Sequence, residues 1–253
     1  MTVHASPPNR TEEPRSFGAH AARPLTGLES IRDATGALAA VDSPRTLREA
    51  LPVFLRHGSP RILIAVLTLS VATRLWLADW SWWDLVPFAA LVAYWPIQEW
   101  LIHVNILHFR PFTLLGRTID FRVPRSHRAH HRAPWQIDIL FIPMHSFTYT
   151  IPILVLFWRA ATPTAALAST GLVAHFALSL HYEWVHFLAH TRVAPRTKLY
   201  QRLSRNHRLH HFKNEHFWYG VTMLSGDRLF GTAPVVKQVP TSRTCREILG
   251  EAA

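Results

Sequence analysis

Two stretches of the sequence, RSHRAHHR (Arg125–Arg132) and RNHRLHH (Arg205–His211), each carry three histidines at positions i, i+3 and i+4. This spacing places three side chains on one face of an α-helix. Neutral imidazole is a good ligand for iron, zinc, nickel or copper, so several imidazoles on one helix face can converge on a metal ion. The two stretches therefore predict a metal centre.

Four long apolar runs predict membrane-spanning helices at 62–80, 85–107, 139–158 and 165–188. Each reaches the roughly 20 residues that a bilayer requires. The averages of 49% hydrophobic residues and +0.06 mean hydropathy look ordinary because arginine-rich segments dilute these runs. The first run contains Arg74 near one end, where its stem can snorkel to the headgroups, and a buried helix of a soluble domain is the alternative there. We expect an all-α, integral-membrane bundle of about four transmembrane helices.

The positive charge is distributed as in a membrane protein. A net charge of +11 would suit nucleic acid, but the arginines flank apolar runs and no nucleic-acid-binding motif is evident. Arginines crowd the connection at 110–137 and the segment after the fourth run. The positive-inside rule places this connection, both termini and the C-terminal region in the cytoplasm. The second and fourth runs then end on that side, which predicts a cytoplasmic helical cap that carries the histidines.

The domain organisation follows from the same pattern. We expect a flexible leader at 1–55 without a signal peptide, a membrane domain at 56–238 and a tail at 239–253. One weak helix is expected within the leader, around 43–55. Cys245 is the only cysteine, which rules out an intrachain disulfide and a thiolate metal site. Any metal must be held by histidine and carboxylate.

Histidines occur in four spaced groups, HVNILH, HRAHH, HFLAH and HRLHH, which use ten of the 17 histidines in the chain. Ten ligands are more than one ion can use, so two ions with about five ligands each are expected. His186 is preferred over His181 as the partner of His190, because i and i+4 share a helix face. The metalloprotease motif HExxH is absent, and a spaced arrangement is unlike a metal-buffering histidine tract.

The order of these groups resembles the fatty acid hydroxylase and sterol desaturase superfamily of integral-membrane, non-haem di-iron enzymes. The segment NEHFWYGVTMLSGDRLFGT (residues 214–232) resembles the terminal pattern of that family. The glycines of its last part, GDRLFGT, indicate a turn. The similarity covers about residues 95–232. Ligating imidazoles need an acceptor for their second nitrogen, and the candidates are Glu99, Glu183, Asn214 and Asp227. The metal ligands that the resemblance implies are His103, His108, His127, His130, His131, His186, His190, His207, His210 and His211.

The resemblance also implies the chemistry. It implies two iron ions, with zinc as a substitute in purified protein, and O2 as co-substrate for hydroxylation of a lipid, most simply a fatty acyl chain. Sterol or hopanoid desaturation and carotenoid hydroxylation remain alternatives, and a non-redox zinc-binding membrane protein is an alternative of a different class. The sequence shows no haem, flavin or iron–sulfur domain, so an external electron-transfer protein is expected, for which the arginine-rich surface is a candidate docking site.

Overall fold

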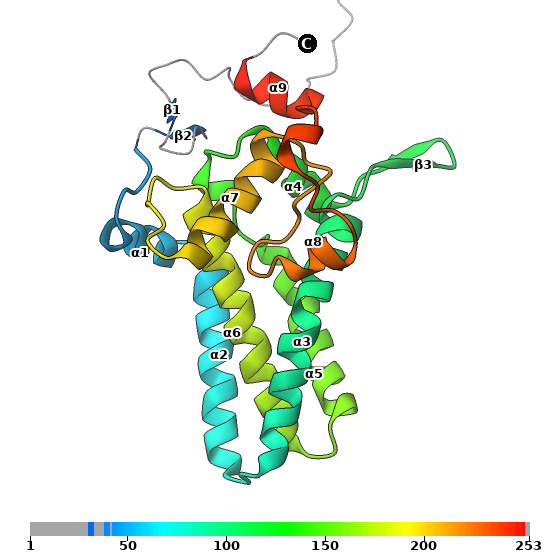
Figure 1. The fold of residues 1–253 in the computed structure, drawn as a ribbon. Helices are drawn as coiled ribbons and strands as arrows, with labels where there is room; N and C mark the ends of the chain where they lie inside the picture. Colours follow the sequence, from blue (N-terminus) through cyan, green and yellow to red (C-terminus); the bar gives the residue numbers. More distant parts are fainter. Residues whose placement is uncertain (1–29, 33–37, 41, 251–253) are drawn as a thin grey trace, which may run out of the picture.

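The computed structural model describes residues 30–32, 38–40 and 42–250, which form a long helical bundle with a helical cap at one end (Figure 1). The bundle consists of α2 (Gly58–Leu77), α3 (Leu85–Ile102), α5 (Phe147–Ala161) and α6 (Ala165–Ala189). The remaining α-helices are α1 (Leu47–Arg56), α4 (Arg122–Arg132), α7 (Lys198–Phe212), α8 (Ser225–Leu229) and α9 (Arg243–Leu249).

Two short antiparallel hairpins accompany the helices. In the first, β1 (Ser30–Arg32) pairs with β2 (Leu38–Ala40). In the second, β3 (Phe112–Leu114) pairs with β4 (Arg117–Ile119), with Phe112 opposite Ile119. This second hairpin projects sideways from the cap (Figure 1). The described fold is thus mainly helical, as predicted.

Three segments are long and apolar enough to cross a membrane: Gly58–Leu77, Trp82–Leu107 and Ile137–Ala161. The fourth predicted span corresponds to α6, which is long enough but is not among them. It carries buried polar residues such as His175 and Glu183. Since α6 packs against α2, α3 and α5, these helices shield it, and it needs less lipid-facing apolar surface. Apolar length thus marks three segments as candidate spans, and α6 lies packed among their helices.

The bundle core joins the four helices through large side chains. Leu63, Phe147 and Phe176 connect α2, α5 and α6, and Trp158 of α5 packs beside α3 and α6 in a second cluster. The ring of Trp158 lies so close to Gly171 that a Cβ at this position would come within 2.3 Å of it. Gly171 thus permits the close approach of α5 to α6.

The third apolar run is not helical from its start. The chain is irregular between two short 3-10 turns, Ile137–Ile139 and Met144–Ser146, and α5 begins only at Phe147. Within the irregular part, the Ile142 amide donates to the Glu183 carboxylate at 2.8 Å. At 15 residues, α5 itself is about 22 Å long, and the preceding connection supplies the rest of the apolar segment Ile137–Ala161. Glu183 thus has a structural partner in this connection.

Arg74 lies inside the protein rather than snorkelling to the headgroups. Its side chain is 3% exposed, and its Nη2 donates to both carboxylate oxygens of Asp84 at 2.8 and 2.9 Å. It also donates from Nε to Thr170 and lies over the ring of Trp80. The charge is therefore neutralised within the protein at the end of the bundle.

Ordered packing extends beyond both expected limits of the membrane domain. Ala50 and Phe54 of α1 are buried in a cluster with Phe187, so part of the predicted leader packs on the bundle. In the predicted tail, Cys245 and Ile248 of α9 are buried, and α9 contacts α7. Residues 1–29, 33–37 and 41 of the expected leader and the last three residues, 251–253, lie outside the described residues.

Candidate metal centre

The ten histidines singled out in the sequence come together in the cap as two groups of five. Within each group the potential donor nitrogens all lie within 4.8 Å of one another. The first histidine group is His103, His108, His127, His131 and His210. The second histidine group is His130, His186, His190, His207 and His211.

Each HxxHH cluster is divided between the two groups. On α4, His127 and His131 belong to the first group and His130 to the second. On α7 the division is reversed, because the i and i+4 histidines belong to the second group and His210 to the first. At 3.6 residues per turn, i and i+4 lie about 40° apart, whereas i+3 lies about 60° to the other side. The same helical spacing thus directs two rings to one centre and one ring to the other.

His103 and His108 reach the first group because α3 changes its helical form at its end. Residues His103–Leu107 form a π-helical turn, closed by a hydrogen bond from the His108 amide to the His103 carbonyl at 3.1 Å. In a regular α-helix, residues five apart point about 140° away from each other. The wider turn brings residue 108 above residue 103, and such turns are frequent at functional sites.

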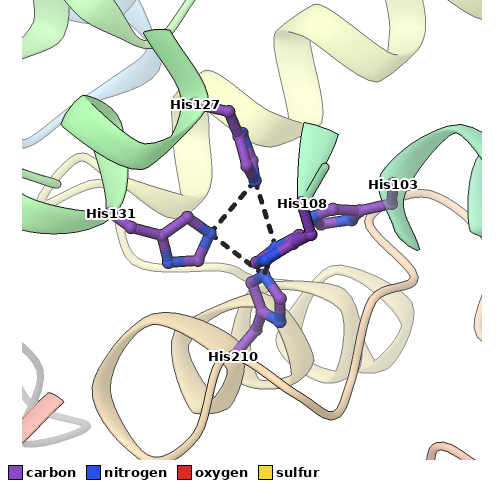
Figure 2. A group of neighbouring side chains, drawn as sticks. All are labelled: His103, His108, His127, His131 and His210. Atoms are coloured by element: carbon purple, nitrogen blue, oxygen red, sulfur yellow. Dashed lines mark hydrogen bonds between the residues drawn. The ribbon is translucent and has the colours of Figure 1, made fainter. Parts of the chain in front are cut away.

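The rings of the first group face a common centre (Figure 2). Their Nε2 atoms are 3.1 Å apart between His131 and His127, and 3.2 Å apart between His108 and His210. The Nδ1 of His103 donates to the Tyr219 carbonyl at 2.7 Å, and the Nδ1 of His210 donates to the Phe217 carbonyl at 2.7 Å. A neutral imidazole that donates from Nδ1 presents a lone pair at Nε2. Such lone pairs repel each other unless a cation lies between them.

Several ring nitrogens in the two groups are buried without a hydrogen-bond partner. They include Nε2 of His103, Nδ1 of His130 and of His207, and both nitrogens of His211. A buried polar atom without a partner costs roughly 1–3 kcal/mol. The donor set is neutral nitrogen throughout, which suits iron or zinc. These residues therefore fit a pair of bound metal ions.

Burial keeps the cap histidines uncharged. For the six histidines of α4 and α7, burial is the main cause that holds the pKa of each imidazole well below its usual 6.5, and neighbouring imidazoles lower it further. The rings are therefore neutral at pH 7, which is the form that binds metals. The six histidines of α4 and α7 with this lowered pKa are His127, His130, His131, His207, His210 and His211.

A turn at residues 217–222 holds the first group in place, and Asp227 holds this turn. Asp227 is fully buried and accepts hydrogen bonds from the amides of Tyr219 and Gly220, both at 2.8 Å. Asn206 donates to the Gly220 carbonyl at 2.8 Å. Trp218 adopts a positive φ of 58°, which is uncommon for a residue other than glycine. Asp227 thus acts through the backbone rather than on a ring.

Glu99 supports the same turn from the bundle. It accepts hydrogen bonds from the amide of Val221 and from the amide of Thr222 at 2.9 Å. Gly220 has no room for a side chain, because a Cβ would lie 2.6 Å from the Met223 carbonyl oxygen. The sequence predicts Glu99 and Asp227 as acceptors for imidazoles, but in the described part of the chain both carboxylates bond to the turn and to nearby hydroxyl or amide groups.

The segment GDRLFGT forms the one-turn helix α8 and then a turn. At Gly226, a Cβ would lie 2.4 Å from the Pro96 carbonyl oxygen, so α8 packs closely on α3. Thr232 donates to Asp227 at 2.7 Å and accepts from the indole of Trp100 at 2.9 Å. The motif therefore anchors the cap to the end of α3.

The other candidates have different surroundings. Glu183 accepts from the Ser59 hydroxyl and from the backbone of the connection before α5. Asn214 bonds to the Pro240 carbonyl and the His216 amide after the end of α7. His181 is exposed and belongs to neither group.

The fatty acid hydroxylase family model matches residues 88–232, more than half of the chain and including all ten histidines of the two groups. The chain therefore belongs to the fatty acid hydroxylase family.

Individual known proteins are also similar to the chain. It is 27% identical over 154 residues to the dihydroceramide fatty acyl 2-hydroxylase FAH2 of Arabidopsis thaliana, and 26% identical over 162 residues to FAH1 of the same organism. These matches cover 60% and 61% of this chain but 62% and 63% of the relatives, slightly less than two thirds of their length. The structure of full-length scs7p, with only the hydroxylase domain visible, has a similar fold, with a TM-score of 0.54 at 18% identity over 79% of this chain and 71% of that one.

Proposed function

We propose that this protein is an O2-dependent lipid hydroxylase that converts a C–H bond of a fatty acyl chain into C–OH. The observation that carries the proposal is the pair of five-histidine groups at the end of an apolar helical bundle. The names of the Arabidopsis relatives, fatty acyl 2-hydroxylases of dihydroceramide, support an acyl substrate.

The two histidine groups would each hold one iron ion. Two bound iron ions, once reduced, supply the activation of O2. The protein's own contribution is orientation, because the carbonyls of Phe217 and Tyr219 fix the tautomers of His210 and His103. Burial of the rings keeps water and competing protons away from the centre.

An apolar cavity supports a lipid substrate. It has a volume of about 770 Å³ and extends from Trp83, just before α3, along α3 to Gln98, between α3, α5 and α6. At the end of the cavity nearest the cap, its polar lining residues are Gln98 and His175, whose Nε2 atoms lie 3.4 Å apart. Gln98 precedes His103 by five residues, or about 7.5 Å along α3. We propose that this cavity holds part of an acyl chain.

We also propose that the histidine groups and both termini lie on the cytoplasmic side. The arginines of the 110–137 connection support this orientation through the positive-inside rule. A C-terminal fusion to alkaline phosphatase, which is active only outside the cytoplasm, is expected to be inactive. An active fusion would reverse the orientation.

The proposed reaction is tested with protein purified without O2 and reconstituted in lipid. Metal analysis is expected to give two irons per chain, and O2 uptake with a reductant is expected to depend on added lipid. Mass spectrometry of the lipids should show a gain of one oxygen that disappears in the His127→Ala variant. Two bound irons without lipid-dependent O2 uptake would refute the hydroxylase.

The alternatives give different results in the same experiment. Loss of two hydrogens from a sterol, hopanoid or acyl lipid identifies a desaturase, and oxygen added to a carotenoid identifies a carotenoid hydroxylase. Zinc as the bound metal, with no O2 uptake after exchange for iron, identifies a non-redox zinc protein.

A further inference from the structure

A positively charged hollow lies on the cap, beside α7 and α8. It has a volume of about 560 Å³, and its lining includes Arg202, Arg205, Arg228 and Lys237. No aspartate or glutamate lines it. We call it the basic hollow.

The four cations of the basic hollow are free to bind a partner. All four are exposed. In the described part of the chain, no hydrogen bond or ion pair is formed by any of these four side chains, unlike Arg74, Arg128 and Arg243, which have carboxylate partners. Four unpaired cations around one concavity create a positive potential that attracts and orients an acidic surface.

The inner wall of the basic hollow is the structure that holds the first histidine group. Asn206, which donates to the Trp218 and Gly220 carbonyls, lies in this wall together with Trp218. The ring of Trp218 is 5.8 Å from that of Phe217, whose carbonyl accepts from His210. Asn206 is also the immediate neighbour of His207 on α7. The wall of the hollow thus shares α7 and the turn at residues 217–222 with the histidine groups.

We propose that the basic hollow is the docking site for an acidic, one-electron carrier protein that reduces the metal centre. This inference rests on the proposed function, since hydroxylation requires R–H + O2 + 2 H⁺ + 2 e⁻ → R–OH + H2O. Two reduced carrier molecules each give up one electron and leave oxidised, and the protons come from water. The partner is a protein with a cluster of carboxylates around its redox group. These carboxylates pair with the three arginines and the lysine of the basic hollow.

The test uses the full chain in vesicles of neutral lipid, with reduced plant-type [2Fe–2S] ferredoxin, an acidic carrier, as the probe. Dithionite with methyl viologen serves as the parallel reductant, because a small mediator needs no docking site. The test variant is Arg202→Glu/Arg205→Glu/Arg228→Glu. The matched control is Arg117→Glu/Arg122→Glu/Arg125→Glu, which reverses three exposed cap arginines outside the hollow and changes the net charge equally.

In the test variant, the KM for ferredoxin should rise at least about tenfold and lose its dependence on salt. Turnover with dithionite and methyl viologen should remain unchanged in both variants. The control should keep most of the ferredoxin-driven activity, because the basic hollow is intact.

Three results would overturn the proposal. The first is an equal loss of ferredoxin-driven activity in both variants, which would assign the effect to net charge. The second is a wild type that turns over with the mediator but not with ferredoxin. The third is an effect that appears only in vesicles with anionic lipid, which would make the hollow a headgroup site. Absence of turnover with either reductant would instead refute the hydroxylase function itself.

Discussion

Replacing Asp227 by asparagine tests how the turn at residues 217–222 controls the first histidine group. The carboxylate accepts from the amides of Tyr219 and Gly220 and from the Thr232 hydroxyl at 2.7 Å. An asparagine amide has one acceptor oxygen, so in either orientation one of the two backbone amides faces an NH2 group. Loss of one charged, buried hydrogen bond, together with the weakening of its neighbours, is expected to lower the free energy of unfolding by about 2–4 kcal/mol.

The effect on metal binding should be selective. The turn carries the carbonyls that orient His103 and His210, both members of the first group. Removal of such orienting contacts typically lowers metal affinity about 10–100-fold. Anaerobic titration of the metal-free variant with Fe(II) against a chelator should therefore show one weakened site and one unchanged site. In the wild type both sites should be tight.

The matched control is Glu247→Gln, which removes one negative charge from an exposed ion pair on α9. It should leave both affinities and the unfolding free energy nearly unchanged. Equal weakening of both iron sites in Asp227→Asn would refute the reasoning, because the turn would then support the whole cap. Unchanged affinity despite lower stability would also refute it.

Three further predictions follow from other parts of the structure. One histidine from each group is replaced in His130→Ala and in His210→Ala, and each variant should lower the hydroxylation rate more than about 100-fold. The far-ultraviolet circular dichroism spectrum should stay near that of the wild type. Normal turnover in either variant would remove that residue from the ligands. Asp84→Ala leaves the buried Arg74 without its carboxylate and should destabilise the bundle by about 3 kcal/mol, measured as a lower melting temperature in detergent, whereas Arg74→Met/Asp84→Leu should recover much of this loss. The metal-free protein should lose stability as the pH falls below about 6.5, because the unfolded chain then takes up protons at histidines whose pKa is held well below 6.5 in the folded cap. The melting temperature should be steady above pH 7 and decline towards pH 5. A flat profile would contradict the burial argument.

The sequence was most informative where spacing alone determines geometry. The ten histidines selected by their spacing are the same ten that the structure gathers into two groups, and His186 rather than His181 is the member from α6. The apolar runs located the bundle helices to within a few residues for α2, α3 and α6, and less well for α5. Hydropathy could not indicate that α6 is the central helix, because its surroundings depend on how the other three pack around it.

The partner of a buried polar residue was beyond the reach of the sequence. The apolar run predicts Arg74 at the headgroups, yet it pairs with Asp84 ten residues later, and Thr170 completes the site from another helix. Glu99 lies 122 residues before its partner Val221. Such contacts depend on tertiary placement, so the sequence identified the carboxylates as important without identifying what they hold.

The division of the histidines shows where helix geometry stops being sufficient. Helical spacing requires that an HxxHH cluster splits two to one if two centres lie to either side of the helix, but it does not say which centre receives the pair. That choice follows from how α4 and α7 face each other: His131 and His211 stack with ring centroids 4.1 Å apart, although they belong to different groups. Each helix thus gives its pair to one centre and its third ring to the other, while α3 and α6 each complete one centre with two further rings. Either helix alone would leave both centres incomplete, so the two ions that we propose would tie α4 to α7 and stabilise the cap in which they are bound.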